Sequence, residues 1–159
     1  MPTATPPTVG DRAPDFTLPT DTSEPLTLSS LRGRPVVLYF YPRDDTSGCT
    51  VEACEFRDLF PRFDAAGATV LGVSPDPVRA HQRFKAKYAL PFTLLADTEH
   101  QAAEAYGVWR EKQMYGRRFM GVERTTFVLD RGGRVARVFE RVRPAGHAEA
   151  VAAALAGLG

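Results

Sequence analysis

The sequence predicts an α/β fold in which a mixed central sheet is flanked by helices on both faces. Between residues 36 and 106, short apolar runs typical of buried strands alternate with longer segments of helical pattern. The chain then reaches a hairpin signal, Asp130-Arg131-Gly132-Gly133, between two further apolar runs, which adds antiparallel strands. A length of 159 residues suits one domain over residues 1–159.

The N-terminal part is expected to extend the sheet. Residues 1–14 are a leading segment rich in Pro and Thr, of which residues 1–8 are expected to be mobile. Phe16–Leu18 and Leu26–Leu28 are predicted as two short strands around a Pro/Thr/Ser turn. Because Met1–Gly10 has neither a basic region nor an apolar core, it does not resemble a secretory signal, and a cytoplasmic location is expected.

The main strands and helices follow from apolar runs and breaker residues. Val36–Tyr41, bounded by Pro35 and Pro42, is predicted as a buried strand, and further strands are expected over Thr69–Val73, Phe92–Ala96, Thr125–Leu129 and Val135–Phe139. A first helix is expected from Cys49 toward Phe60, and Pro61 should end or kink it. A second helix is expected to start after Ser74 or Asp76, one of which would cap it, and to run to Tyr88. Two more helices are expected over Glu99–Tyr106 and Gly146–Leu158. Val108–Val122 is expected to be an irregular aromatic and basic loop.

Charge and composition exclude several classes of partner. The chain has 20 basic and 19 acidic residues, a net charge of +1, so neither nucleic acid nor an acidic membrane is an expected partner. Two cysteines in a reducing compartment favour a reactive role over a structural disulfide. His81, His100 and His147 are far from the cysteines in sequence, so no metal site is expected, and the three histidines are interpreted as surface residues.

Cys49 is distinguished by its position. It follows the polar loop Arg43–Gly48, which the predicted order places beyond the carboxyl end of a central strand, and it lies where a helix is expected to begin. Backbone N–H groups and the positive end of the helix dipole favour the thiolate there, and the thiolate is the nucleophilic form. The alternative, a small inert core residue, fits poorly with the Ser-Gly approach to Cys49.

The spacing between Cys49 and Cys54 predicts a conformational requirement. If both are helical, five residues separate their Cα atoms by roughly 8.5 Å. Disulfides rarely span more than about 7 Å between Cα atoms. Either the two cysteines never bond, or the first helical turns unravel after Cys49 is oxidised so that Cys54 can reach it.

Motifs along most of the chain resemble the peroxiredoxins. Pro42-x-x-x-Thr46-x-x-Cys49 is similar to that family's active-site motif, and Gly10-Asp11-Arg12-Ala13-Pro14-Asp15-Phe16-Thr17-Leu18 resembles its N-terminal segment. Three further segments resemble the bacterioferritin-comigratory-protein (PrxQ) branch of that family: Cys49-Thr50-Val51-Glu52-Ala53-Cys54, Tyr106-Gly107-Val108-Trp109 and Met114-Tyr115-Gly116. The resemblance implies a thioredoxin-like α/β fold with an N-terminal strand extension.

The resemblance also implies roles for the motif residues. Cys49 would be the peroxidatic thiolate, and Cys54 would resolve its sulfenic acid as a disulfide. Thr46, with backbone N–H groups around Cys49, would donate hydrogen bonds to the leaving oxygen. Pro42 would shape and dry the pocket. Arg124 would be the catalytic arginine, a permanent cation that favours the thiolate and orients the peroxide.

Three other residues are expected near this site. Glu52 lies one turn past Cys49, where it could either hydrogen-bond within the site or stabilise the helix dipole from the first turn. Trp109 and Tyr115 are expected to pack beside the pocket as core or loop residues.

The function implied by the resemblance is reduction of hydrogen peroxide and small organic hydroperoxides, with thioredoxin or a similar thiol as reductant and no haem, flavin or metal. A monomer is expected, because one chain holds both cysteines. The alternative is a redox sensor that signals to a partner protein through the Cys49–Cys54 switch, which need not turn over. A general disulfide reductase is disfavoured, because four residues rather than two separate the cysteines.

Overall fold

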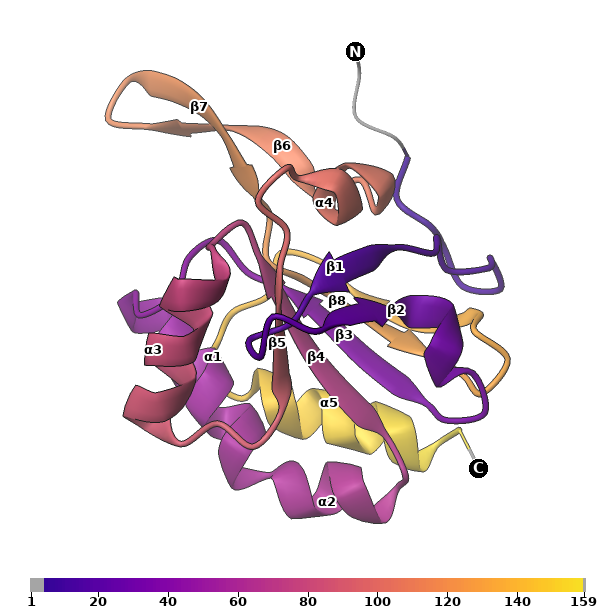
Figure 1. The fold of residues 1–159 in the computed structure, drawn as a ribbon. Helices are drawn as coiled ribbons and strands as arrows, with labels where there is room; N and C mark the ends of the chain where they lie inside the picture. The colour runs from indigo at the N-terminus through magenta and orange to yellow at the C-terminus, as the bar shows by residue number, and fades with distance from the viewer. Residues whose placement is uncertain (1–4, 159) are drawn as a thin grey trace.

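A five-stranded mixed sheet forms the centre of the fold (Figure 1). The structure, a computed structural model, describes residues 5–158. The strand order is β5-β4-β3-β8-β9, with bounds Val36–Phe40 for β3, Thr69–Ser74 for β4, Thr93–Ala96 for β5, Thr125–Leu129 for β8 and Val135–Phe139 for β9. Strand β3 is parallel to β4 and antiparallel to β8. The mixed sheet and its strands are as predicted to within one residue at each end.

Two apolar clusters cover the two faces of this sheet. Every residue of β3 is buried, and alternate side chains point to opposite faces, so Leu38 joins one cluster and Val37 the other. The Leu38 side is covered by β1 (Thr17–Pro19), β2 (Pro25–Thr27), the short 3₁₀ helix η1 (Leu28–Leu31) and α4 (Gln101–Ala105). The Val37 side receives side chains from α1 (Ser47–Asp58), α2 (Phe60–Ala65), α3 (Val78–Tyr88) and α5 (His147–Ala156).

The N-terminal strands form the expected extension, each displaced by one residue from its predicted position. β1 and β2 pair antiparallel as a separate two-stranded sheet. Of the segment expected to be mobile, residues 1–4 lie outside the described part of the chain. Thr8 is held by Asp11, whose carboxylate accepts from the Thr8 backbone N–H at 2.8 Å.

The helices start and end at other residues than predicted: α4 spans Gln101–Ala105 instead of Glu99–Tyr106, and α5 spans His147–Ala156 instead of Gly146–Leu158. α1 begins at Ser47 with Thr46 as N-cap, so Cys49 lies inside the first turn instead of at its start. Pro61 does separate two helices, because α1 ends at Asp58 and α2 carries that proline in its first turn. The prediction of Ser74 or Asp76 as cap of the next helix is wrong: the N-cap of α3 is Pro77.

The segment Val108–Val122 is a β-hairpin, which corrects the predicted irregular loop. Strands β6 (Trp109–Met114) and β7 (Arg117–Val122) pair antiparallel and project away from the central sheet (Figure 1). Tyr115 and Gly116 form the turn with φ of 54° and 75°, the left-handed pair that a two-residue hairpin requires. The signal was obscured because most side chains of both strands are exposed and half of them are polar, which removes the apolar alternation of a half-buried strand.

No helix within residues 5–158 combines the length and apolarity that crossing a membrane requires.

Candidate active site

Cys49 is placed by the connection between β3 and α1. The chain leaves β3 at Phe40, passes through the loop around Pro42, and enters α1 at Ser47. The Cys49 side chain is buried in the Val37-side cluster, at 2% exposure, and the thiol is free. In the first turn of a helix the backbone N–H groups have no intrahelical partner, so they are available to an anion or a polar ligand beside Cys49.

Arg124 brings a cation to the sulfur of Cys49. It lies between β7 and β8, and its Nη2 donates to Cys49 Sγ at 3.2 Å. Its Nη1 donates to Glu52 Oε1 at 2.6 Å, which fixes the plane of the guanidinium. The Arg124 side chain is only 15% exposed, so both contacts are shielded from solvent.

Glu52 is the buried carboxyl group that pairs with Arg124. Burial raises the pKa of Glu52 to about 7, and the neighbouring Arg124 charge only partly offsets that effect. Its second oxygen, Oε2, is buried and has no hydrogen-bond partner among the residues that the structure describes. The helix-dipole interpretation of Glu52 is therefore wrong: the carboxyl group faces Arg124 from beyond the first turn of α1.

His147 lies behind Glu52, which corrects its expected place on the surface. It is the first residue of α5 and is buried, with Nε2 at 2.7 Å from Thr126 Oγ1 and 4.0 Å from Glu52 Oε2. Burial, reinforced by the positive charge of Arg124, lowers the pKa of His147 to about 4. A neutral imidazole thus stands next to the Arg124–Glu52 pair at neutral pH.

Thr46 and Pro42 belong to the loop in front of Cys49. Thr46 is exposed at the N-cap of α1, and its hydroxyl donates to the carbonyl oxygen of Arg43 at 3.1 Å. With its proton used in that way, the Thr46 oxygen offers lone pairs, and so acts as an acceptor instead of the expected donor. Pro42 is half-buried where the chain leaves β3 and carries no backbone N–H.

Cys54 lies on the same continuous helix as Cys49. It is partly exposed, and both thiols are free. An intact helix between the two residues holds their Cα atoms farther apart than a disulfide spans. The structure is therefore the reduced, helical form.

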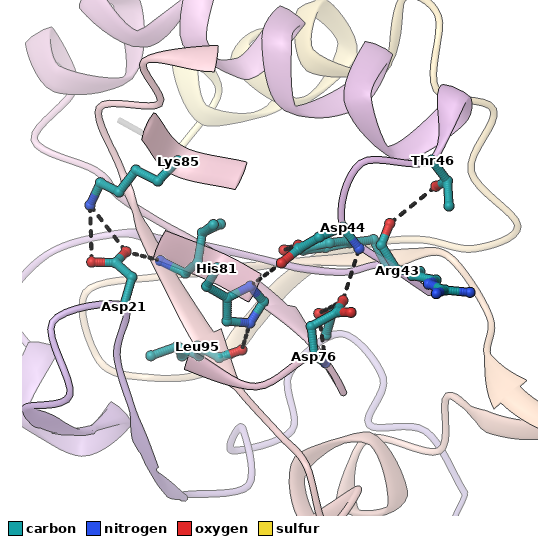
Figure 2. Close-up of polar contacts among 11 residues, drawn as sticks. Asp21, Arg43, Asp44, Thr46, Asp76, His81, Lys85 and Leu95 are labelled. Carbon is teal, nitrogen blue, oxygen red and sulfur yellow. Dashed lines mark hydrogen bonds and ion pairs between the residues drawn. The ribbon is translucent and has the colours of Figure 1, made fainter. Parts of the chain in front are cut away.

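A buried polar network that the sequence did not reveal supports the loop (Figure 2). Asp44 and His81 pair with Nδ1 to Oδ2 at 2.7 Å, and His81 has no exposed side-chain surface, so its expected surface position is wrong. The available signal was the spacing of His81 three residues before the buried Phe84, on the inward face of a helix.

The two aromatic candidates differ in their surroundings. Trp109 stacks on the half-buried His100, with ring centroids 3.7 Å apart. Tyr115 is 96% exposed at the turn of the β6–β7 hairpin, so its expected packing beside the pocket is wrong. Within the described residues, no group of three or more His, Cys, Asp and Glu side chains is placed to hold a metal ion.

Known proteins resemble this chain in sequence and in structure. Residues 9–138 match the model of the AhpC/TSA family. The putative peroxiredoxin Bcp of Coxiella burnetii is 52% identical over 139 residues, which cover 87% of this chain and 92% of that protein. Peroxiredoxin Bcp of Bacillus subtilis is 46% identical over 139 residues, 87% of this chain and 88% of the relative.

Solved structures show the same fold. Peroxiredoxin Q of Xanthomonas campestris superposes with a TM-score of 0.88 at 41% identity, over 95% of this chain and 96% of that one. The bacterioferritin comigratory protein of the same organism, studied for its alkyl peroxide reduction activity, has a TM-score of 0.88 at 40% identity, with 95% and 96% covered. The fold is thus thioredoxin-like, as the resemblance implied. On its sequence and its fold, the chain belongs to the AhpC/TSA family, in the Bcp/PrxQ group of peroxiredoxins, which are thiol peroxidases.

Proposed function

We propose that this protein reduces hydrogen peroxide and small organic hydroperoxides through Cys49, with Cys54 as the resolving cysteine and thioredoxin or a similar dithiol as the reductant. The observation that carries the proposal is the contact between Arg124 Nη2 and Cys49 Sγ at 3.2 Å, in the first turn of a helix. A fixed cation and free N–H groups there stabilise a thiolate and the charge that develops on a departing oxygen. The alkyl peroxide reduction activity studied in the Xanthomonas campestris relative supports the substrate class.

The first step is attack of the Cys49 thiolate on the nearer peroxide oxygen. A sulfur–oxygen bond forms and the oxygen–oxygen bond breaks, so sulfur is oxidised to sulfenic acid and the peroxide leaves as water or an alcohol after taking up a proton. Arg124 and the first-turn N–H groups stabilise the charge on the departing oxygen. The Thr46 oxygen, as an acceptor, orients the peroxide through its O–H group.

The second step joins Cys49 to Cys54. The Cys54 thiol attacks the sulfenic sulfur, a disulfide forms and water leaves. Because an intact α1 keeps the two Cα atoms roughly 8.5 Å apart, the first turns must unwind for this step. A dithiol reductant then attacks the disulfide, and a second exchange releases both cysteines as thiols.

The same proposal covers the setting of the reaction. Both cysteines are free thiols, which suits a reducing compartment such as the cytoplasm. One chain carries the complete pair, so a monomer can perform the whole cycle.

The test is peroxide consumption coupled to thioredoxin, thioredoxin reductase and NADPH, with wild type compared with Cys49→Ser. We expect catalytic turnover in wild type and its abolition in the variant, because a serine hydroxyl is not ionised near neutral pH. Substantial turnover by Cys49→Ser would reject Cys49 as the nucleophile. A single stoichiometric oxidation of wild type without turnover would favour the redox-sensor alternative.

A further inference from the structure

His81 and Asp44 form a buried pair beside the active-site loop (Figure 2). The His81 side chain, on α3, has no exposed surface, and the Asp44 side chain is 5% exposed. His81 Nδ1 lies 2.7 Å from Asp44 Oδ2, and Nε2 lies 2.9 Å from the carbonyl oxygen of Leu95 in β5. One imidazole therefore connects the loop between β3 and α1 to a helix and to a strand of the central sheet.

The partners of the two ring nitrogens determine where the protons lie. A carbonyl oxygen only accepts, so Nε2 carries a hydrogen. The contact between Nδ1 and Asp44 needs one more proton, which lies on the imidazole or on the carboxyl group, and in both arrangements the pair is neutral overall. Loss of that proton would leave a buried carboxylate facing a nitrogen lone pair, which is costly. The pair is thus a neutral unit that holds one proton.

Asp44 is bound on its other sides as well. Its Oδ1 accepts from the Tyr41 hydroxyl at 2.5 Å, and its backbone N–H donates to Asp76 Oδ2 at 2.8 Å. The same Asp76 oxygen accepts from the Ser74 hydroxyl at 2.6 Å. Tyr41 belongs to the same connection after β3 as Asp44, whereas Asp76 lies in the connection between β4 and α3, so Asp44 is tied to that second connection as well as to α3.

The fixed loop leads directly to residues that the proposed function uses. Thr46 follows Asp44 by two residues, its hydroxyl donates to the carbonyl oxygen of Arg43, and it is the N-cap of α1. Arg124 reaches Cys49 from the segment before β8, through contacts that include neither Asp44 nor His81. A displaced Asp44 would therefore move Thr46 and leave the Arg124–Cys49 contact in place.

We propose that the Asp44–His81 pair is a positioning device for peroxide reduction, which sets the place of Thr46 relative to Cys49 Sγ by fastening the loop to α3 and β5. The two residues act through Thr46 and do not touch the peroxide. This inference rests on the proposed function: a peroxide needs Thr46 and the sulfur in a fixed relation, whereas a simple alkylating agent needs the thiolate alone.

The test compares two reactions of the same sulfur in a Cys54→Ser background, where only Cys49 reacts. Stopped-flow oxidation by hydrogen peroxide reports on the positioned site, and alkylation by iodoacetamide reports on the thiolate. His81→Phe removes both hydrogen bonds of the ring. We expect it to slow oxidation by roughly 10- to 100-fold while alkylation stays within about twofold of the parent.

Asp44→Asn is the conservative counterpart. An asparagine amide can donate to a neutral His81 Nδ1 while its oxygen accepts from Tyr41, so every contact of the carboxyl group has a replacement. We expect Asp44→Asn to keep the oxidation rate within about threefold of the parent. If His81→Phe is oxidised at the rate of the parent, the proposal is overturned. It is also overturned if the rates of oxidation and alkylation fall equally, because that indicates general damage to the thiol site.

A second measurement uses the reduced protein with both residues intact and covers a failure of His81→Phe to fold. Nitrogen-15 spectra of the histidine rings should show a slowly exchanging proton in the hydrogen bond between His81 Nδ1 and Asp44 at pH 6 to 8. Rapid exchange of that proton with solvent would overturn the proposal. If the parent itself is not oxidised at Cys49 by peroxide, it is the proposed function that fails, and the ring spectra still report on the pair.

Discussion

A β-carbon on residue 48 would lie 3.3 Å from Nη2 of Arg124, so Gly48 leaves room for the guanidinium beside the first turn of α1. The ring of Pro144 would be 3.4 Å from the same carbon on another side. Arg124 is itself held by Glu52 and by Cys49 Sγ. A side chain at position 48 would therefore press on the guanidinium group that makes those two contacts.

Gly48→Ala should for this reason slow peroxide oxidation of Cys49 by roughly 3- to 10-fold, since Arg124 loses its alignment with the sulfur. Gly157→Ala is the matched control, because among the described residues its new carbon would meet only the Ala154 carbonyl oxygen, at an ordinary 3.5 Å. Stopped-flow oxidation measures both. Equal rates in the two variants would show that the fit of Arg124 against Gly48 has no bearing on reactivity.

Arg124→Ala should reduce the thiolate fraction of Cys49 and slow its oxidation by roughly 100-fold, because the only side-chain donor to Sγ in the described residues is removed. Arg137→Ala is the control: Arg137 is exposed on β9 and packs over the Phe139 ring. Thiolate absorbance against pH and stopped-flow oxidation test the pair of variants. A similar effect of both substitutions would show that Arg124 has no specific influence on Cys49.

Glu52 should make folding stability fall as pH rises. Its pKa in the folded protein is about 7 against 4.5 in an unfolded chain, so the protonated form is favoured by folding. The stabilisation is complete below about pH 4.5 and is lost through about pH 7, by at most about 1.4 kcal/mol per pH unit. In urea titrations across this range, wild type should lose stability relative to Glu52→Gln as pH rises. A constant difference would contradict the raised pKa.

His147 should have the opposite effect. Its pKa in the folded protein is about 4 against 6.5 in an unfolded chain, so folding favours the neutral ring. That contribution is complete above about pH 6.5 and is lost as pH falls toward 4. Relative to His147→Gln, wild type should therefore lose stability on acidification. The expectation fails if the two proteins show parallel stability curves between pH 4 and 7.

The central sheet was predictable because its strands are buried on both faces. Runs such as Val36–Phe40 and Thr125–Leu129 are apolar throughout and are separated by strong turn residues. The β6–β7 hairpin gave no such signal, since most of its side chains are exposed and half are polar. Tyr115 also adopts a left-handed conformation that is uncommon for its residue type. The cap of α3 was also missed, because the Asp76 carboxylate accepts from the Asp44 backbone N–H and from the Ser74 hydroxyl instead.

The site residues were predictable where a local motif or the family resemblance indicated them, as it did for Arg124, which lies 75 residues from Cys49. The short spacing from Pro42 through Thr46 to Cys49 lies within one connection, so sequence alone located that part. The buried partners Asp44, His81 and His147 come from a loop and from two helices far apart in the chain. The Asp44–His81 pair spans 37 residues and the hydrogen bond of His147 to Thr126 spans 21, and a single histidine on a helix does not reveal which carboxylate, carbonyl or hydroxyl group it will meet.

Oxidation should loosen the start of α1 and leave the loop before it in place. Peroxide treatment should accelerate amide exchange over Gly48–Phe56, because a helix that holds the cysteines apart cannot contain their disulfide. The Asp44 amide, which donates to Asp76 at 2.8 Å, should stay protected and serve as the internal reference. Equally slow exchange of Gly48–Phe56 in the reduced and oxidised proteins would contradict the required unwinding.

The most direct test is mass spectrometry of the protein after treatment with one equivalent of hydrogen peroxide. Cleavage after Glu52 cuts the chain between the cysteines, so a disulfide between them appears as two linked peptides that separate on reduction. We expect that Cys49–Cys54 linkage in protein that still migrates as a single chain, whereas Cys54→Ser should accumulate sulfenic and then sulfinic acid on Cys49. Wild type in which both cysteines remain open to alkylation, or are joined only between chains, would contradict the account.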